Sequence, residues 1–143
     1  MNKNDDLKKI ENFVEDDVED NLLISHMNGS FNDAFIFIYN YFEMTSDNVC
    51  VKLCGLTHKT IASYYNKTAK EPHYKNVIAI CCGFNLRPRV SKKLLSTIRI
   101  DLDISTAPED HLYNILLHTN YNESTDEWNE HIKEANIGYQ HML

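Results

Sequence analysis

The polar side chains that could do chemistry gather in one short stretch, residues 57–66, with the sequence THKTIASYYN. Lys59, Ser63 and Asn66 recur there at intervals of three and four residues. On a helix they would share one face, with His58 beside them at its start. Lysine and asparagine are familiar partners of phosphates and base edges, although arginine, which binds guanine with two hydrogen bonds, is missing here. This face therefore predicts a surface that recognises phosphates or base edges.

The other reactive residue types do not combine into a catalytic or metal-binding pattern. Cys81 and Cys82 are adjacent and would point about 100° apart on a helix. Cys54 and His58 are separated by a predicted helix end, so a tetrahedral zinc site is not expected. We interpret the four cysteines as small buried core residues. The seven histidines are scattered and no glycine-rich loop is present. The sequence therefore predicts no enzyme activity, no metal and no cofactor.

The residues before this stretch can position it as a helix. Gly55 can end a helix over residues 46–54. Thr57 is a good N-cap because its hydroxyl can accept a free backbone amide of the next turn. Ile61 and Tyr64 share the face opposite the polar one. Two short helices joined through a tight glycine turn are typical of a helix-turn-helix, whose second helix enters the major groove of DNA.

The flanking segments complete a helical domain. Residues 31–43 are apolar on nearly every side, which predicts a buried helix, and residues 73–85 form a second strongly apolar helix. Arg87-Pro88-Arg89 ends that run, and we expect Ser91 to cap a fifth helix that reaches Thr97. Four glycines and three prolines in the chain favour helices over a turn-rich β fold. The predicted fold class is all-α.

The N-terminal segment, residues 5–19, predicts an acidic amphipathic helix. Its apolar residues recur at helical spacing, and they are Leu7, Ile10, Phe13, Val14 and Val18. We interpret this stripe as a cover for the domain core, and the alternative is a dimer contact or a partner-binding arm.

The C-terminal segment predicts two more helices. Residues 98–104 alternate apolar and charged residues, and without a strand partner they predict an extended connector. A helix over residues 107–118 is expected to turn Leu112, Ile115 and Leu116 inward. A last helix begins at Ser124, with Glu127 completing a capping box, and its apolar face is formed by Trp128, Ile132 and Ala135.

Charge is segregated along the chain. The net charge is −7, but residues 1–30 carry −5, residues 31–100 carry +6 and residues 101–143 carry −8. A local basic patch attracts phosphate more than the total charge repels it. The basic excess falls on the segment that contains the predicted helix-turn-helix.

The chain resembles the lambda-repressor-like (XRE-type) helix-turn-helix regulators over about residues 30–90. The matching residues are Gly55-Leu56-Thr57, Thr60-Ile61, Pro72, 77–80 and 84–86. A weaker likeness continues through Leu94-Leu95 and Tyr113 to Trp128-Asn129, as in regulators with a short helical C-terminal extension. The resemblance implies a five-helix domain and a sequence-specific regulator of transcription that binds double-stranded DNA, plausibly as a homodimer. Its groove-facing residues would be Lys59, Ser63 and Asn66, and its phosphate contacts His58, Lys67 and Lys70.

A second function class stays open. The same scaffold can bind a protein instead of DNA, and the acidic ends could compete for a basic nucleic-acid-binding surface. Phage-borne inhibitors of nucleases act in this way.

The chain length and its hydropathy limit the possible domain organisation and compartment. The chain of 143 residues fits an acidic N-terminal arm (1–29), a helix-turn-helix domain (30–97) and an acidic C-terminal extension (98–143). No apolar run approaches the ~20 residues of a membrane helix. The first residues are not followed by an apolar signal core. We expect a cytoplasmic protein without a membrane partner.

Overall fold

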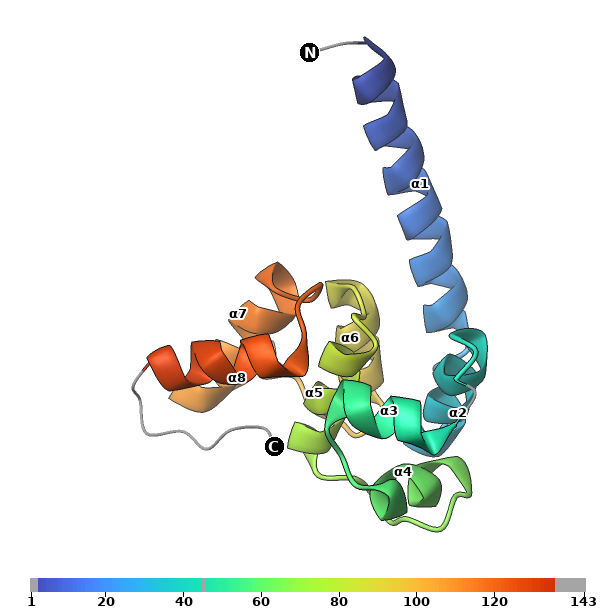
Figure 1. Cartoon of the computed structure of the whole chain (residues 1–143), viewed down its shortest axis with the longest axis vertical. Helices are drawn as coiled ribbons and strands as arrows, with labels where there is room; N and C mark the ends of the chain where they lie inside the picture. The colour runs from blue at the N-terminus through green and yellow to red at the C-terminus, as the bar shows by residue number, and fades with distance from the viewer. Residues whose placement is uncertain (1–2, 45, 136–143) are drawn as a thin grey trace.

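The computed structural model describes residues 3–44 and 46–135, and within them the chain is all-helical (Figure 1). The all-α prediction is confirmed. The described residues form eight α-helices and one short 3₁₀ helix, η1, at Leu102–Ile104. The α-helices are α1 (Lys3–Ser25), α2 (Phe31–Tyr41), α3 (Asp47–Cys54), α4 (His58–Tyr65), α5 (Tyr74–Gly83), α6 (Pro88–Ser96), α7 (Pro108–Thr119) and α8 (Thr125–Glu134).

Helix α5 is the centre of the fold. Every residue from Val77 to Gly83 is buried, which agrees with a sequence that is apolar on all sides. Helices α3, α6, α7 and α8 all pack against it. The residues expected to form the core are buried, none with more than 7% of its surface exposed: Ile61, Val77, Ile80, Phe84 and Leu86.

The four cysteines lie in this core, as predicted. Cys50 and Cys54 are fully buried on α3, with their sulfur atoms 4.0 Å apart. Burial raises the pKa of both Cys81 and Cys82 to about 12, so these side chains remain thiols at neutral pH.

Helices α7 and α8 belong to the same core. Tyr113 of α7 and Trp128 of α8 are both fully buried. The indole N–H of Trp128 donates to the carbonyl oxygen of Asn120 at 2.8 Å. The predicted capping box is present, because Ser124 and Glu127 each accept from the other's backbone N–H.

Details of the sequence prediction are wrong for α6, α7 and α8, and residues 102–104 of the predicted extended connector form η1. Helix α6 begins at Pro88 and not after Ser91, because proline at the first position presets a helical backbone. Ser91 is buried inside the helix, where its hydroxyl donates to the carbonyl oxygen of Leu86 at 3.3 Å. Ile115 is 57% exposed, since the buried face of α7 follows Tyr113, Leu116 and Leu117. Ala135 is also exposed.

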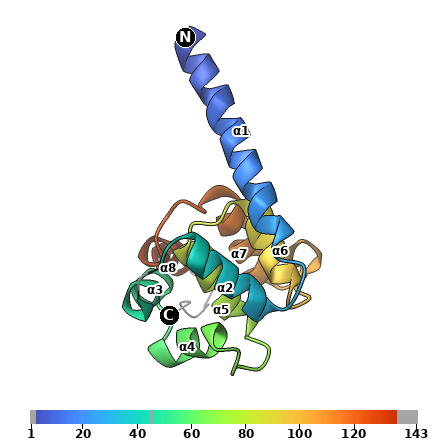
Figure 2. The ribbon, with the colours of Figure 1, turned by 90° about the vertical axis from the view of Figure 1, so that its right-hand side faces the viewer.

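Helix α1 projects from the body (Figures 1 and 2). It runs to Ser25, six residues beyond the predicted end. It packs mainly against α6, and Glu19 also accepts a hydrogen bond from Tyr41 of α2. Leu23 and the following Met27 are buried, whereas residues 7–18 are all exposed. The interpretation of the apolar stripe as a core cover is therefore wrong for all five residues named above: Leu7, Ile10, Phe13, Val14 and Val18. None of the described helices combines the length and apolar character needed to cross a membrane.

Candidate nucleic-acid interface

The turn between α3 and α4 has the predicted construction. Gly55 adopts the left-handed conformation (φ 68°, ψ 17°), which glycine enters at little cost. Its N–H donates to the carbonyl oxygen of Val51 at 2.6 Å and so ends α3. The hydroxyl of Thr57 accepts from the Thr60 N–H at 3.2 Å and so begins α4. Both predicted caps are confirmed.

The inward face of α4 holds this helix firmly against α2. Ile61 is fully buried, and the Tyr64 ring meets Phe31 and Phe35 edge to face, with centroids 5.1 and 5.7 Å apart. The side-chain amide of Asn32 donates to the Tyr64 carbonyl oxygen at 2.9 Å. Because α4 is fixed on this side, its other face has a defined orientation.

The outward face of α4 carries most of the predicted recognition residues. His58, Lys59 and Asn66 are exposed. Ser63 is half-buried, and its hydroxyl donates to the Thr60 carbonyl oxygen at 2.7 Å within the helix. Helix α4 lies at the end of the molecule away from the projecting part of α1 (Figures 1 and 2).

Lys67 and Lys70, the two lysines predicted to contact phosphate, have different surroundings. The Lys67 ammonium lies 2.6 Å from Asp33 of α2, and this hydrogen-bonded contact lowers the pKa of the Asp33 carboxyl. Lys59 and Lys70 form no ion pair with any described residue, so their charges face solvent. Lys70 lines a surface hollow between the start of α2 and the end of α6.

Arg99 lines the same hollow, and sequence reasoning missed it. Its backbone is left-handed (φ 62°) directly after the end of α6. The turn brings Arg99 to the rim of the hollow that Lys70 also lines. Such a juxtaposition depends on tertiary packing, and no local signal in the sequence could have found it.

The acidic N-terminal helix forms ion pairs with two arginines at the start of α6, Arg87 at its N-cap and Arg89 in its first turn. Arg87 and Arg89 bind carboxylates from one stretch of α1: Arg87 lies 3.4 Å from Asp16, 2.6 Å from Glu19 and 2.7 Å from Asp20, and Arg89 lies 2.8 Å from Asp17. The Tyr41 hydroxyl also donates to Glu19 at 2.9 Å. These arginines are therefore used to attach α1.

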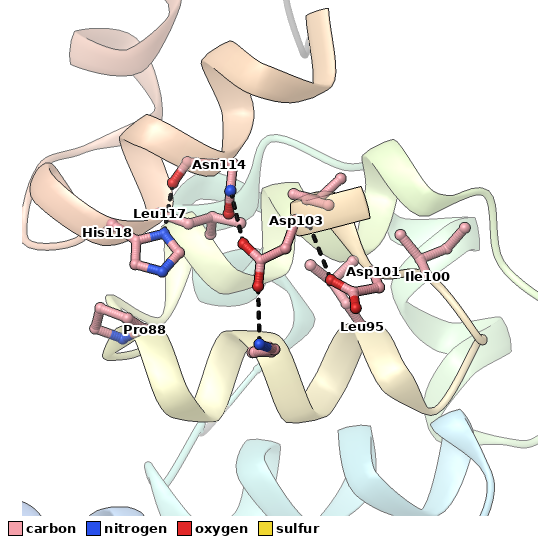
Figure 3. A pocket seen from close by; sticks show the side chains of 10 residues that line it. Pro88, Leu95, Ile100, Asp101, Asp103, Asn114, Leu117 and His118 are labelled. Atoms are coloured by element: carbon pink, nitrogen blue, oxygen red, sulfur yellow. Dashed lines mark hydrogen bonds and ion pairs between the residues drawn. The ribbon is translucent and has the colours of Figure 1, made fainter. Parts of the chain in front are cut away.

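Carboxylates of the acidic C-terminal segment likewise form ion pairs with two lysines. Asp103 lies 2.8 Å from the Lys92 ammonium and also accepts from the Asn114 amide at 2.9 Å (Figure 3). The hydrogen bond from Lys92 is the main cause that lowers the pKa of Asp103. Lys75 lies 2.6 Å from Glu109 of α7. Five of the ten basic residues in 31–100 thus have a carboxylate partner among the residues that the structure describes.

The described residues contain no group of three or more His, Cys, Asp or Glu side chains placed to hold a metal ion. Comparison of the chain with models of known protein families, with characterised proteins and with solved structures found no match.

Proposed function

We propose that this chain is a sequence-specific DNA-binding regulator of transcription, of the lambda-repressor-like (XRE-type) class, and that α4 is its recognition helix. The observation that carries the proposal is the two-sided character of α4. Its apolar side is locked against α2, and its polar side presents His58, Lys59 and Asn66 to solvent. The five helices α2 to α6, within residues 31–96, provide the expected number and order for this fold.

Each residue has a distinct proposed role. Lys59 and Asn66 would contact base edges, and Ser63 would make a closer, weaker contact because its hydroxyl proton is used within the helix. His58 and Lys70 would contact phosphates, joined by Arg99 across the hollow. Lys67 would have to leave Asp33 first. Both side chains of that pair are more than half exposed, so exchanging a carboxylate for a phosphate costs little.

The proposed compartment is the cytoplasm, where the DNA of a bacterial regulator of this class lies. The four buried cysteines suit a reducing compartment, because none of them is paired in a disulfide.

A second candidate is a protein-binding function through the acidic C-terminal segment, and one observation favours it. Helix α8 exposes four carboxylates within ten residues: Asp126, Glu127, Glu130 and Glu134. Such a surface could bind a basic protein and compete with nucleic acid for it.

Selection from random duplex DNA tests the proposal directly. The full-length chain would be used to enrich duplexes, and its affinity for an enriched and a scrambled duplex would be measured at two salt concentrations. The proposal predicts an enriched site that binds at least tenfold more tightly than its scrambled form. Equal affinities for the enriched and the scrambled duplex would show that the chain does not read DNA sequence. If no binding occurs at low salt, where phosphate attraction is strongest, only the protein-binding candidate remains.

A further inference from the structure

Three segments that are distant in the sequence meet around the hollow that Lys70 and Arg99 line. They are the start of α2, the connection between α4 and α5, and the turn after α6. The hollow has a volume of about 330 Å³. Small-molecule sites in proteins measure about 300–1,000 Å³, so this hollow has room for one small ligand.

The positive charges at this hollow are not neutralised within the chain. Lys70 and Arg99 are both exposed, and neither forms an ion pair with a carboxylate among the described residues. Glu71 is the acidic residue of the lining, so the lining carries two positive charges and one negative charge. A concave surface with an excess of one sign of charge concentrates ions of the other sign. The hollow therefore favours an anion.

The other polar groups of the lining are already used inside the chain. The Ser30 hydroxyl accepts from the Asp33 N–H at 3.2 Å, and the Thr97 hydroxyl donates to the Leu94 carbonyl oxygen at 2.6 Å. The side-chain amide of Asn32 donates to the Tyr64 carbonyl oxygen. The side chains left to bind a ligand by charge are those of residues 70, 71 and 99.

The rest of the lining is apolar. Phe31 and Ile98 are buried, and Ala69 and Pro72 are half-buried. Small-molecule sites usually combine an apolar lining with a few polar groups that fix the orientation of the ligand. This lining therefore suits an anionic group that is attached to an organic group better than it suits a bare inorganic ion.

We propose that this hollow binds a small phosphate monoester. A guanidinium group can donate two parallel hydrogen bonds to a phosphate, and an ammonium group binds it as a point charge. Arg99 and Lys70 supply these two groups. The apolar residues would cover the organic part of the ligand, and the Glu71 carboxylate would accept a hydrogen bond from a ligand hydroxyl. A nucleoside monophosphate has all three features.

A phosphate of the DNA backbone offers the same chemistry as the monoester. The two ligands would therefore compete for Lys70 and Arg99, and the small molecule would weaken DNA binding. This competition rests on the proposed function, whereas binding of the monoester to the hollow does not.

Amide chemical shifts of the full-length chain test the site, in a titration with adenosine 5′-monophosphate. We expect shifts at residues 30–32, 69–72 and 97–99, with a dissociation constant on the order of 0.1–1 mM because both cations are exposed. Inorganic phosphate should shift the same amides more weakly, and adenosine, which lacks the phosphate, should shift them little. The proposal is overturned if the monophosphate shifts none of these amides, or if adenosine shifts them equally.

Two substitutions in the hollow and one outside it test the assignment of the charges. Lys70→Ala and Arg99→Gly should each weaken monophosphate binding about tenfold. Arg99→Gly keeps the turn, because glycine enters the left-handed backbone of this position (φ 62°) at little cost. Lys52→Ala is the matched control, since it removes the same charge from an exposed lysine of α3. Equal weakening by Lys52→Ala and Lys70→Ala would reveal a general effect of net charge and would contradict the site.

Competition with the selected duplex distinguishes the two sources of phosphate. Adenosine 5′-monophosphate should raise the apparent Kd of the duplex more than sodium chloride of equal ionic strength does, and an equal effect would refute the competition. If the monophosphate binds in the hollow and no duplex binds, the site stands and the proposed function fails. If duplex binding depends on Lys70 but the monophosphate shifts no amide, the hollow serves only the DNA backbone, and this inference fails while the proposed function stands.

Discussion

At the residue scale, the close packing of α5 on α3 depends on the absence of a side chain at Gly83. Gly83 ends α5 against α3, and a Cβ added there would lie 2.5 Å from the Cys54 sulfur and 2.9 Å from the Cys54 Cα. The nearest obstacle includes backbone, which cannot rotate away. A larger residue at this position would push α3, and with it the Gly55 turn and α4, away from the core.

Gly83→Ala should therefore destabilise the protein by about 1–3 kcal/mol through overpacking. Urea unfolding followed by circular dichroism would measure the change in the free energy of unfolding. Gly29→Ala is the matched control, because a Cβ there would be 3.5 Å from the nearest atom, in ordinary contact with Asp33. If the two substitutions had the same effect, the close packing of α3 on α5 would be wrong.

Asp103 makes a prediction about pH. The Lys92 hydrogen bond holds the pKa of this carboxyl below its ordinary value of 3.8. Its contribution to folding is thus fully present above about pH 4 and is lost as the pH falls through the lower folded-state pKa. Asp103→Asn should flatten the decline of the melting temperature between pH 5 and 2. Glu130→Gln, which changes an exposed acid of α8, should leave that decline unaltered. A decline that Asp103→Asn does not change would contradict the role of the pair.

Residue types alone predicted the caps at Gly55 and Thr57, and both are present as expected, because each depends on only a few neighbouring residues. The partners of the charged residues could not be predicted. Asp33 lies 34 positions from Lys67 in the sequence, and only the packing of α2 on α4 brings them together.

At the scale of elements, α5 is the helix on which the others depend. Ile80 is fully buried in it, and α3, α6, α7 and α8 pack against α5. Ile80→Ala should lower the free energy of unfolding by about 2–5 kcal/mol through lost burial and an empty cavity. Ile104→Ala removes the same atoms from a residue that is 78% exposed, and surface changes of this kind usually stay within about 0.5 kcal/mol. Equal losses for the two variants would refute the packing described for α5.

The elements differ in how well their sequence predicted them. Helices α2 to α5 follow from apolar periodicity and caps, which are local. The start of α6 was misplaced because Pro88 and Ser91 are both plausible start signals, and only the fold decides between them. The apolar stripe of α1 also could not be assigned from sequence. An amphipathic pattern identifies an apolar face but does not identify the surface that packs against it.

At the scale of the whole molecule, the acidic ends and the basic middle are not separate surfaces. Four of the basic residues in 31–100 bind carboxylates from the two ends. The segregation of charge was visible in the sequence, but this internal neutralisation was not. Among the described residues, Lys59 on α4, and Lys70 and Arg99 in the hollow beside the α4–α5 connection, are basic residues of this segment without a carboxylate partner, and so are Lys52 and Lys93.

The molecule also has two ends of different character. The α1 stripe lies at one end, and α4 lies at the other (Figure 1).

The most direct test of the account is the contrast between Asn66→Ala and Lys70→Ala, with Lys93→Ala as control. Lys93 is a half-buried lysine on α6, and the helices that pack most closely on α4 are α2 and α3. Each variant would be titrated with the selected duplex and its single-base variants at two salt concentrations. Asn66→Ala should lose about 1–3 kcal/mol of discrimination at one base pair. Lys70→Ala should weaken binding to every duplex alike and lower the salt slope by about 1, and Lys93→Ala should change neither. An Asn66→Ala chain that discriminates among the duplexes as well as the unmodified chain would contradict the assignment of α4 as the reading helix.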